Sequence, residues 1–478
     1  MLSISHTLLL KGGFIRSLGR GLYSFLPLGV RVLDNIKQLI KEEMEELGGQ
    51  EVLIPVINPY TIWEKGGRAH LIHKELVRFR DRLGKELVLS PTHEEAAVEL
   101  VRASINSYRD LPVFIFEFQT KFRDEARTRY GLIRTREFIM KDGYSFHRTY
   151  SDLNNFFPKI YAAYERIFKR CNLDVITAEA GVGFIGGDKS YEFLMEASFG
   201  DDVIVRCDNC GYRANREVAV GIKESTSGNP KTMAKVYTPD CTDMVSLAKY
   251  LELPKSQLAK AMVYKTRNEF VMAVVRGDYE VSVEKLTRVL KDQVITKATK
   301  QELVDIGLIP AYLSPVGMPS EIKIVIDDTV ADSVNLVYGG NEEGIHYTNV
   351  NYGRDYETEY IGDIAHIKEE NRCKQCGNPL KEVRAVELGN IFKLGEFYTR
   401  AMDLSFKDDN DVPAYPNMGS YGIGLGRLMA AIVESNRDER GIIWPSHLAP
   451  YKAFLMGIGK SVAVRRAVEE LHDQLPED

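Results

Sequence analysis

The chain has 478 residues, more than one hydrophobic core usually holds, and this length predicts roughly two to four domains. Apolar residues make up 44% and charged residues 27% of the chain, as in ordinary globular proteins. The net charge of −6 excludes a surface that is basic all over, although a local Lys/Arg patch can still bind nucleic acid. The sequence has no apolar run of about 18 residues and no signal-peptide pattern, so we expect no membrane span and a cytoplasmic location.

Helical and extended patterns alternate in the first part of the chain. Apolar residues recur every three or four positions in two long segments, which indicates amphipathic helices. Segments in which apolar and polar residues alternate indicate strands. In chain order, the predicted elements are a helix at 29–48, an extended run at 51–55, a hairpin at 76–89, strands at 114–122 and 137–140, and a helix at 151–171.

The pattern changes between about residues 220 and 370, where short helical stretches alternate with β-branched runs. This alternation is typical of a separate α/β unit, here inserted into the main domain. Its predicted helices lie at 245–253, 283–291 and 300–306, and its strands at 262–264, 270–275 and 323–326. The earlier pattern then resumes with an antiparallel stretch at 382–399, a glycine-rich strand and helix at 418–434, a strand at 450–457 and a helix at 462–474.

The loop between the strands at 114–122 and 137–140 is rich in arginine. Arg123 and Glu125 follow the first strand, Arg134 precedes the second, and Phe138 lies within it. An arginine at a strand end can clamp a carboxylate and a phosphate with its planar fork, and an aromatic ring can stack on a purine. A solvated basic hairpin explains the same pattern, so these residues alone leave both interpretations open.

A second pattern is GSYGIGLGR, residues 419–427, before an apolar helix. Alternating glycines let a strand backbone approach a ligand closely, and Arg427 then lies at the start of the helix. A glycine-rich turn before a helix is the alternative. A dinucleotide-binding fold is a poor match, because the segment comes late and no acidic residue on a second strand follows it.

Four of the six cysteines form two CxxCG pairs, one on each side of the inserted unit. This spacing is typical of a zinc knuckle, although reduced cysteines can also lie in ordinary turns. We predict a structural Zn²⁺ held by Cys207, Cys210, Cys373 and Cys376.

Together, the arginine-rich loop and the glycine-rich segment resemble motifs 2 and 3 of the class II aminoacyl-tRNA synthetases. Residues 48–55 resemble motif 1, the usual dimer element. The stretches SPTHEEA, QTKFRDEARTRYGLIRTREFIMKDGYSFH, ELGNIFKLGEFYTRAM and DERGIIWPSHLAPY narrow the resemblance to prolyl-tRNA synthetases of the bacterial type, over nearly the whole chain.

The resemblance implies an α+β fold, in which an antiparallel sheet flanked by helices is interrupted by an inserted α/β domain. It implies activation of proline with ATP and Mg²⁺, transfer to the proline tRNA, and a homodimer formed around residues 32–55. The implied catalytic residues, which hold the ATP phosphates, are Arg123 and Arg427. The implied ATP-binding set is Arg123, Glu125, Arg134, Phe138, Glu387 and Arg427, and the proline-binding set is Thr92, Glu94, Arg123, His147 and Ser420.

The inserted unit resembles the family's editing domain, which hydrolyses alanine wrongly attached to the proline tRNA. A pocket for proline cannot strongly reject the smaller alanine, so a second site is needed. The implied editing residues are Lys260, Asp327 and His346, which by themselves read as an ordinary lysine, aspartate and histidine.

The implied catalytic domain has two parts, residues 1–219 and 371–449, and the implied editing insert between them is 220–370. Residues 450–478 would form part of an anticodon-binding domain. We expect such a stub to leave adenylate formation intact and to weaken tRNA charging, since anticodon contacts position the tRNA. Two alternatives are a noncatalytic paralogue that binds tRNA and a stand-alone editing hydrolase. The residues expected to bind phosphate and proline are all present, which argues against a noncatalytic paralogue. A stand-alone editing hydrolase would not need them.

Overall fold

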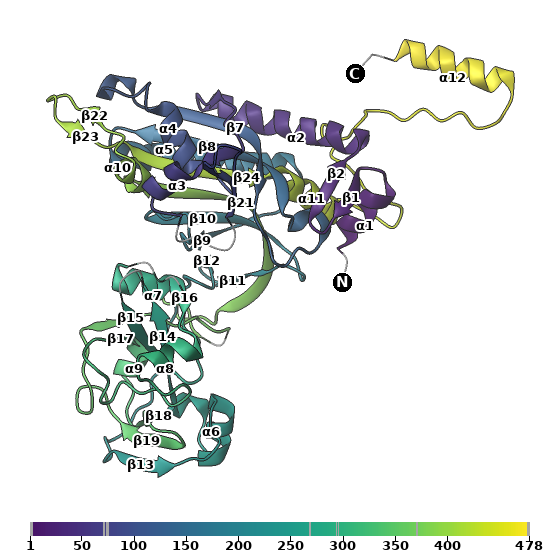
Figure 1. Ribbon diagram of the computed structural model, residues 1–478. Helices are drawn as coiled ribbons and strands as arrows, with labels where there is room; N and C mark the ends of the chain where they lie inside the picture. Colours follow the sequence, from purple (N-terminus) through teal and green to yellow (C-terminus); the bar gives the residue numbers. More distant parts are fainter. Residues whose placement is uncertain are drawn as a thin grey trace.

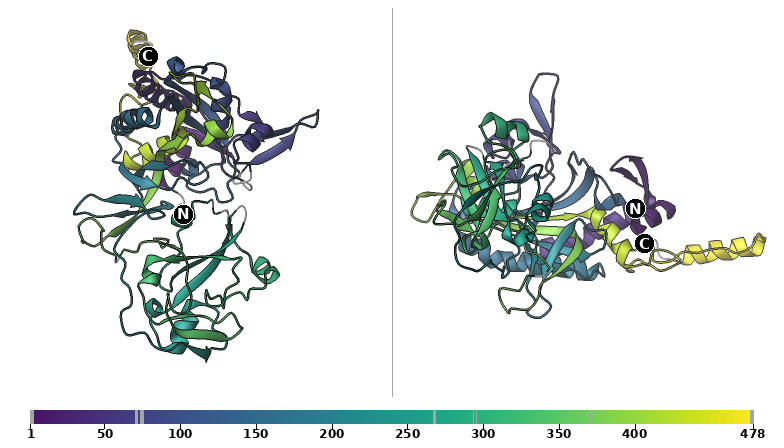
Figure 2. Two further views of the ribbon diagram at one scale, coloured as in Figure 1. Left: turned by 90° about the vertical axis from the view of Figure 1, so that its left-hand side faces the viewer. Right: turned by 90° about the horizontal axis from the view of Figure 1, so that it is seen from below.

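The computed structural model describes residues 3–69, 72, 76–266, 269–292, 294, 296–369 and 371–475. The chain forms a body around one large sheet, and the middle of the chain forms a smaller unit that lies below the body in Figure 1. Helix α12, Val462–Gln474, extends away from both (Figures 1 and 2). Within the described ranges, no helix is long and apolar enough to cross a membrane.

The large sheet has nine strands, and neighbouring strands are antiparallel except for the pairs β12–β9 and β3–β7. This arrangement, with helices on its faces, confirms the predicted α+β class. In sheet order the strands are β10 Lys189–Glu196, β9 Ile176–Ala180, β12 Arg213–Asn215, β11 Asp202–Arg206, β21 Lys381–Gly395, β24 Asn417–Gly424, β8 Glu137–His147, β7 Val113–Phe122 and β3 Gln50–Glu51.

Three helices cover one face of this sheet: α2 Pro27–Glu46, α5 Tyr150–Arg170 and α11 Leu425–Ser435. The proline at the start of α2 suits a first helical turn, and Thr149 and Asp152 form a capping box that starts α5. The apolar residues that predicted helices at 29–48 and 151–171 pack into the core, so both predictions are confirmed.

The opposite face carries α4 Glu94–Val101 and α10 Phe397–Ala401, which pack on Tyr144, Phe146 and Met418. The hairpin predicted at 76–89 forms, whereas of the extended run at 51–55 only the first residue is in a strand. The remaining elements of the body are α1 Ile4–Lys11, β1 Ile15–Gly19, β2 Leu22–Phe25, β4 Ile57–Pro59, α3 Tyr60–Lys65, β5 Val77–Arg80, β6 Glu86–Leu89, η1 Tyr108–Asp110, η2 Gly131–Ile133, β22 Phe406–Lys407 and β23 Pro413–Ala414.

The smaller unit contains a five-stranded sheet, β16-β14-β15-β17-β20, and a three-stranded sheet, β13-β19-β18. Its apolar cores are separate from those of the body. Its strands are β13 Ala234–Tyr237, β14 Ala259–Lys265, β15 Phe270–Arg276, β16 Thr296–Lys297, β17 Lys323–Asp327, β18 Leu336–Gly339, β19 Ile345–Val350 and β20 Tyr360–Gly362. Its helices are α6 Met244–Leu251, η3 Lys255–Gln257, α7 Val283–Leu290, α8 Lys300–Asp305 and α9 Asp328–Ala331.

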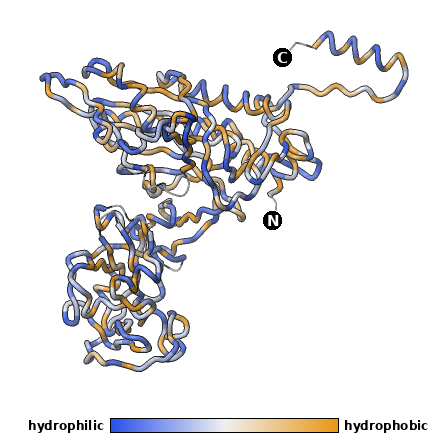
Figure 3. The backbone as a smooth tube through the Cα atoms, in the orientation of Figure 1, coloured by the Kyte–Doolittle hydropathy of each residue, from blue (hydrophilic) through white to orange (hydrophobic). Residues whose placement is uncertain are grey.

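The strand predicted at 450–457 is wrong, because this segment has no regular structure. Its apolar side chains are in solvent, with Phe454 84% and Met456 64% exposed. A strand needs a neighbour for its backbone hydrogen bonds, and none of the described strands lies beside this segment. The helix that follows forms as α12, whose alternating hydrophobic and hydrophilic residues are visible in Figure 3.

Candidate active site

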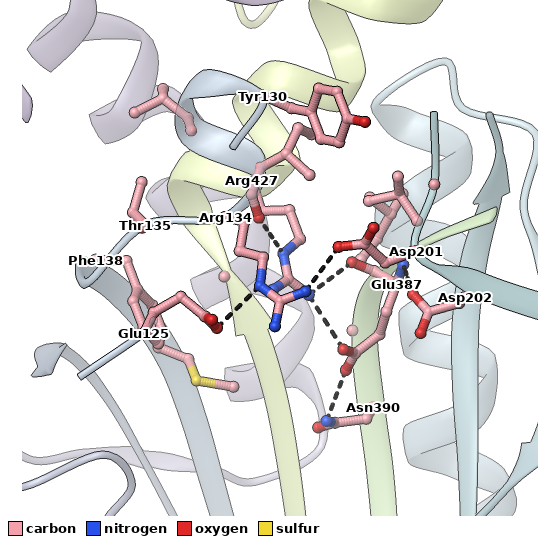
Figure 4. Close-up of a pocket in the computed structure, with 18 of the residues that line it drawn as sticks. Glu125, Tyr130, Arg134, Thr135, Phe138, Asp201, Asp202, Glu387, Asn390 and Arg427 are labelled. Atoms are coloured by element: carbon pink, nitrogen blue, oxygen red, sulfur yellow. Dashed lines mark hydrogen bonds and ion pairs between the residues drawn. The ribbon is translucent and has the colours of Figure 1, made fainter. Parts of the chain in front are cut away.

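A cavity of about 300 Å³ opens between β7, β8, β21 and the start of α11 (Figure 4). This volume lies at the lower end of the range for small-molecule pockets, about 300–1,000 Å³. The cavity gathers all the residues expected to contact ATP, although they come from distant parts of the sequence. They are Arg123, Glu125, Arg134, Phe138, Glu387 and Arg427.

Arg427 enters the cavity from the first turn of α11. Its Nε donates a hydrogen bond to the Ile133 carbonyl at 3.0 Å, and its Nη1 lies 3.1 Å from the Glu387 carboxylate. The preceding strand keeps the cavity open through a glycine: a Cβ at Gly422 would lie 2.3 Å from Cε of Met140. The absence of a side chain at Gly422 thus leaves room for the end of the Met140 side chain beside the cavity.

Arg123 lies at the end of β7, next to the aromatic ring of Phe138. Its guanidinium carbon is 5.3 Å from the centre of that ring, and its Nε donates to the Pro91 carbonyl at 3.2 Å. Because Pro91 directly precedes Thr92, Arg123 links the cavity to the residues expected to bind proline.

Arg134 closes the same side of the cavity by pairing with two carboxylates. It lies 2.9 Å from Glu125 and 2.7 Å from Asp201 (Figure 4). Burial by itself would raise the pKa of Glu125, but hydrogen bonds from Arg134 and from the backbone of Arg127 hold that pKa below its ordinary value. Glu125 therefore stays an acceptor, as an amino group of a purine requires.

The far side of the cavity is acidic, through Glu387 and Asp202, and the half-buried Glu192 lies near both. Burial and the charge of Glu387 raise the pKa of Asp202 to about 6. Burial, together with the charges of Glu387 and Asp202, raises the pKa of Glu192 well above its ordinary value. The mutual repulsion of these carboxylates makes this side of the cavity electrostatically unfavourable for further negative charge.

Three of the residues expected to bind proline meet at the start of α4. Thr92 Oγ1 donates to Glu94 at 2.7 Å, and Ser420 Oγ donates to the other oxygen of Glu94 at 3.0 Å. All three side chains are buried. Ser420 reaches Glu94 because it lies on β24 opposite Tyr144, on the face of the sheet that α4 covers.

His147 is not brought to this group. Successive side chains of a strand point to opposite faces, so His147 lies on the face away from Tyr144 and Phe146. It shares a hydrogen bond of 2.9 Å with Ser145 and packs on Phe156 of α5. Burial lowers the pKa of His147 to about 4, so the ring is neutral at pH 7.

The three residues expected to edit do not touch one another. Asp327 ends β17 fully buried, with Lys223 at 2.7 Å and a Thr329 hydroxyl at 2.5 Å. Lys260 Nζ lies 2.5 Å from Glu280. The ring of His346, on the three-stranded sheet, shares a 2.6 Å hydrogen bond with Thr238.

The four paired cysteines converge at the junction between the body and the smaller unit. The sulfur of Cys207 lies 3.4 Å from that of Cys376, and that of Cys210 lies 3.6 Å from that of Cys373. All four sulfurs lie within 4.8 Å of one another. A tetrahedral Zn²⁺ with bonds of about 2.3 Å holds its sulfurs about 3.8 Å apart, so the group fits this metal.

Sequence reasoning missed three charged residues in or beside the site, of which Arg68 is buried and Asp202 and Glu192 are half-buried. Asp202 and Glu192 come from strands whose pairing with β21 no local pattern reveals. Arg68 pairs with Glu94, and the only signal for it is the acidic dipeptide at the start of a buried helix, which needs a nearby cation.

The structure and sequence were then compared with known proteins. Residues 77–436 match the family model described as the tRNA synthetase class II core domain (G, H, P, S and T). A proline–tRNA ligase from a Sulfurihydrogenibium species is 42% identical over 454 residues, which cover 95% of this chain and 80% of the relative. One from Halothermothrix orenii is 41% identical, over 99% of this chain and 84% of the relative.

A crystal structure of prolyl-tRNA synthetase from Cryptosporidium parvum, complexed with L-proline and AMP, superposes with a TM-score of 0.52. It is 12% identical to this chain, so it shows likeness of fold alone. The superposition covers 98% of this chain, which spans 59% of the length of the crystallised one.

The antiparallel sheet, the arginines that line the cavity and the matching core-domain model define a class II tRNA synthetase. Within that class of ligases, relatives of about 40% identity over nearly the whole chain place it more narrowly. The chain belongs to the proline–tRNA ligase family.

The repulsion around Asp202 predicts that this carboxylate destabilises the free protein. Its pKa is raised to about 6 from an ordinary 3.8, so the penalty is full above about pH 6 and vanishes below about pH 4. Asp202→Asn should therefore raise the free energy of unfolding at pH 7.5 by about 1–3 kcal/mol. Denaturant unfolding at pH 7.5 and at pH 4 measures the free energy of unfolding of the variant and of the unchanged chain.

The neighbouring Asp201→Asn variant is the matched control, because Asp201 is exposed and pairs with Arg134. This variant should not raise the free energy of unfolding at either pH. A gain from Asp202→Asn that is as large at pH 4 as at pH 7.5 would contradict the electrostatic origin.

Proposed function

We propose that the chain activates proline with ATP and transfers it to the proline tRNA. The observation that carries this proposal is the cavity shared by Arg123 and Arg427, which adjoins the amine-binding group of Thr92 and Glu94. The 40% identity to proline–tRNA ligases over nearly the full chain supports the same substrates. The cytoplasm is the location we propose for this reaction.

In the first step, a carboxylate oxygen of proline attacks the α-phosphorus of ATP. The bond from that phosphorus to the bridging oxygen breaks, and pyrophosphate leaves with the electron pair. Arg123 and Arg427 neutralise charge on the phosphates, while Phe138 stacks on the adenine and Glu125 accepts from its amino group. Glu387 and Asp202 would be the cavity residues to hold Mg²⁺, which would supply further neutralisation of the phosphates.

In the second step, a terminal ribose hydroxyl of the tRNA attacks the carbonyl carbon of the adenylate. The bond from that carbon to the phosphate oxygen breaks, AMP leaves with the electron pair, and the hydroxyl proton is released. No side chain need act as a nucleophile in either step. The contribution of the protein is to hold the reacting groups in line and to balance their charge.

We expect that replacing either cavity arginine, Arg123 or Arg427, severely lowers the activation of proline. Arg123→Ala and Arg427→Ala should each lower proline-dependent ATP–pyrophosphate exchange by a few hundredfold, since a charged clamp of this kind contributes about 3–4 kcal/mol. Glu94→Ala should instead raise the KM for proline and leave the KM for ATP unchanged. Exchange kinetics with each substrate varied in turn measure these effects.

Arg354→Ala is the control, because Arg354 is an exposed arginine of the smaller unit that pairs with Asp355. It should exchange as the unchanged chain does. No exchange by the unchanged chain with proline would favour the noncatalytic paralogue, and near-normal exchange by both arginine variants would refute the site.

We propose that the chain forms a homodimer through residues 32–55. The outer surface of this region carries apolar side chains in solvent, with Leu53 75% and the neighbouring Ile57 48% exposed. Exposed apolar residues grouped in this way are typical of a protein interface.

We propose that Cys207, Cys210, Cys373 and Cys376 hold a structural Zn²⁺. The protein purified without chelator should contain roughly one zinc per chain by elemental analysis. Cys373→Ser should lower that content at least severalfold, whereas Cys241→Ser, which changes a buried cysteine outside the cluster, should keep it. Protein with no zinc, or a Cys373→Ser variant with full zinc, would contradict the site.

We propose that residues 220–370 form an editing domain that hydrolyses alanyl-tRNA. Lys260 pairs with Val275, and Val325 pairs with Ala273 on the same strand. Because side chains two residues apart on a strand share a face, Lys260 and Asp327 start from one face of the five-stranded sheet. Together with the resemblance of the insert, this shared face supports a site there. The assignment of residues 1–219 and 371–449 to the catalytic domain, and of 450–478 to an anticodon-binding domain, stays a prediction.

The editing proposal predicts a loss confined to hydrolysis. Lys260→Ala and His346→Ala should slow deacylation of alanyl-tRNA by on the order of a hundredfold, a usual effect of losing one acid–base or polar group. Proline-dependent exchange should not change. Lys235→Ala, an exposed lysine paired with Glu342, is the control. Deacylation that persists in both variants would place editing elsewhere.

A further inference from the structure

The segment that precedes α2 contacts the arginine-rich loop and has no role in the reaction described so far. This leading segment, residues 3–25, consists of α1 and the β1–β2 hairpin and lies against α11 (Figure 1). The backbone N–H of Ser5 donates to Glu434 of α11 at 2.8 Å, and Leu9 is buried in the core of the body. The segment is therefore anchored to the helix that begins with the cavity residue Arg427.

The turn of the β1–β2 hairpin is bonded to one end of the arginine-rich loop, residues 123–136. The carbonyl oxygen of Gly21 accepts a hydrogen bond from the backbone N–H of Arg136 at 2.9 Å. The carbonyl oxygen of Arg136 accepts in turn from the backbone N–H of Arg123, also at 2.9 Å. Nε of Arg136 donates to the carbonyl oxygen of Glu125 at 3.2 Å. Arg136 thus holds two residues of the cavity and is itself held by Gly21.

Glycine is required at residue 21 for two reasons. Its φ of +75° lies in the left-handed region, which residues with a side chain rarely adopt. A Cβ there would lie 2.5 Å from Cγ2 of Thr128 and 3.2 Å from the backbone nitrogen of Arg136. Carbon atoms in contact lie about 3.5–4.0 Å apart, so a methyl group would push the loop back by roughly 1 Å.

The other end of the leading segment contacts the far turn of the loop. The hydroxyl of Ser3 donates to the carbonyl oxygen of Tyr130 at 3.3 Å. A Cβ at Gly131 would overlap the half-buried ring of His6, so this ring lies directly on the loop. The same ring meets the ring of Tyr23 edge-on, with 5.7 Å between their centres, so α1 and the hairpin also hold one another.

This turn carries the carbonyl group that orients the second cavity arginine. The carbonyl oxygen of Ile133, at the end of η2, accepts from Nε of Arg427 at 3.0 Å. The leading segment therefore reaches Arg123 through Arg136, and Arg427 through the turn. Within the part of the chain that the structure describes, no residue that lines the cavity belongs to the leading segment. Its contacts with the loop act on the site from outside.

We propose that the leading segment holds the arginine-rich loop in the position that ATP requires. Gly21 is the positioning residue for Arg123 at one end of the loop. His6 is the positioning residue for Arg427 at the other end. Neither of them contacts the nucleotide. This inference rests on the proposed function, because the cavity is taken to bind ATP.

The test is proline-dependent ATP–pyrophosphate exchange by the full chain, together with equilibrium binding of ATP. Gly21→Ala should lower kcat/KM for ATP about a hundredfold and weaken ATP binding, because a displacement of about 1 Å can cost that much. The KM for proline should stay nearly unchanged, since the hydrogen bonds to the side chain of Glu94 come from outside the loop.

Gly13→Ala is the matched control for the backbone strain. Gly13 lies in the same segment and has a φ of +72°, but a Cβ there meets nothing within 4 Å. This variant should bind and use ATP as the unchanged chain does.

A rescue variant shows whether the loss comes from the contact with the loop. In Gly21→Ala with Thr128→Ala, the atom that lies 2.5 Å from the new methyl group is gone, and the remaining neighbours at 3.2 Å need to move only slightly. The double variant should regain most of the lost kcat/KM for ATP. Thr128→Ala alone should exchange as the unchanged chain does.

His6→Ala tests the other end of the loop and decides the matter if Gly21→Ala does not fold. Removing this ring leaves the turn at Gly131 without support, so ATP should bind severalfold more weakly, while the KM for proline stays nearly unchanged. Lys11→Ala, at the exposed end of the same helix, is the control and should bind ATP normally.

The outcomes distinguish the two proposals. If the unchanged chain shows no exchange with proline, the proposed function fails, and ATP binding by the variants then decides this inference. If Gly21→Ala and His6→Ala bind and use ATP as their controls do, the inference is overturned. It is also overturned if the KM for proline rises as much as that for ATP and the double variant recovers nothing, because Gly21 is then only structural.

Discussion

The antiparallel pairing of β8 with β24 is the interaction on which the site depends. It places Met140 opposite Gly424 and Tyr144 opposite Ser420. Since β7 flanks β8 and α11 follows β24, the arginines after these strands face one cavity. A shift of one residue in this register would turn Ser420 away from Glu94, so the apolar residues that fix the register also fix the site.

The two faces of this sheet are stabilised differently. Apolar side chains of α2, α5 and α11 fill one face, whereas buried charges lie beneath the proposed amine-binding residues on the other. There, Lys121 lies 2.6 Å from Glu117 and 3.2 Å from Asp142. Glu117 in turn accepts from the backbone of Ile54 at 3.0 Å, which ties this network to the segment after β3. Such charges cost desolvation, and a functional site is where proteins accept that cost.

A similar arrangement joins the smaller unit to the chain that enters it. Lys223 lies 2.7 Å from each of the carboxylates of Asp327, Asp328 and Asp363. Three such carboxylates could hold a metal ion, but the ammonium group already occupies the position between them. This ion pairing and the cysteine cluster both involve residues next to the ends of the smaller unit, so charged and cysteine side chains contribute to its attachment as well as apolar packing.

The sequence by itself determined the local elements and the family. The periodicity at 29–48 and the turn between β5 and β6 are local properties of the sequence. Motif residues such as Arg123 and Arg427 revealed the family resemblance, and the resemblance in turn indicated the other residues of the cavity. The strand expected at 450–457 failed because a strand depends on a neighbour that no local pattern describes.

Only the tertiary structure decided which side chains meet. The pleat of β8 sent His147 to the face opposite Glu94, and the folding of the chain after α3 brought Arg68 beneath it. Asp202 joined the cavity through the pairing of β11 with β21. The physical reason is the same in each case: burial and charge act between residues that are close in space, and sequence patterns record only those that are close along the chain.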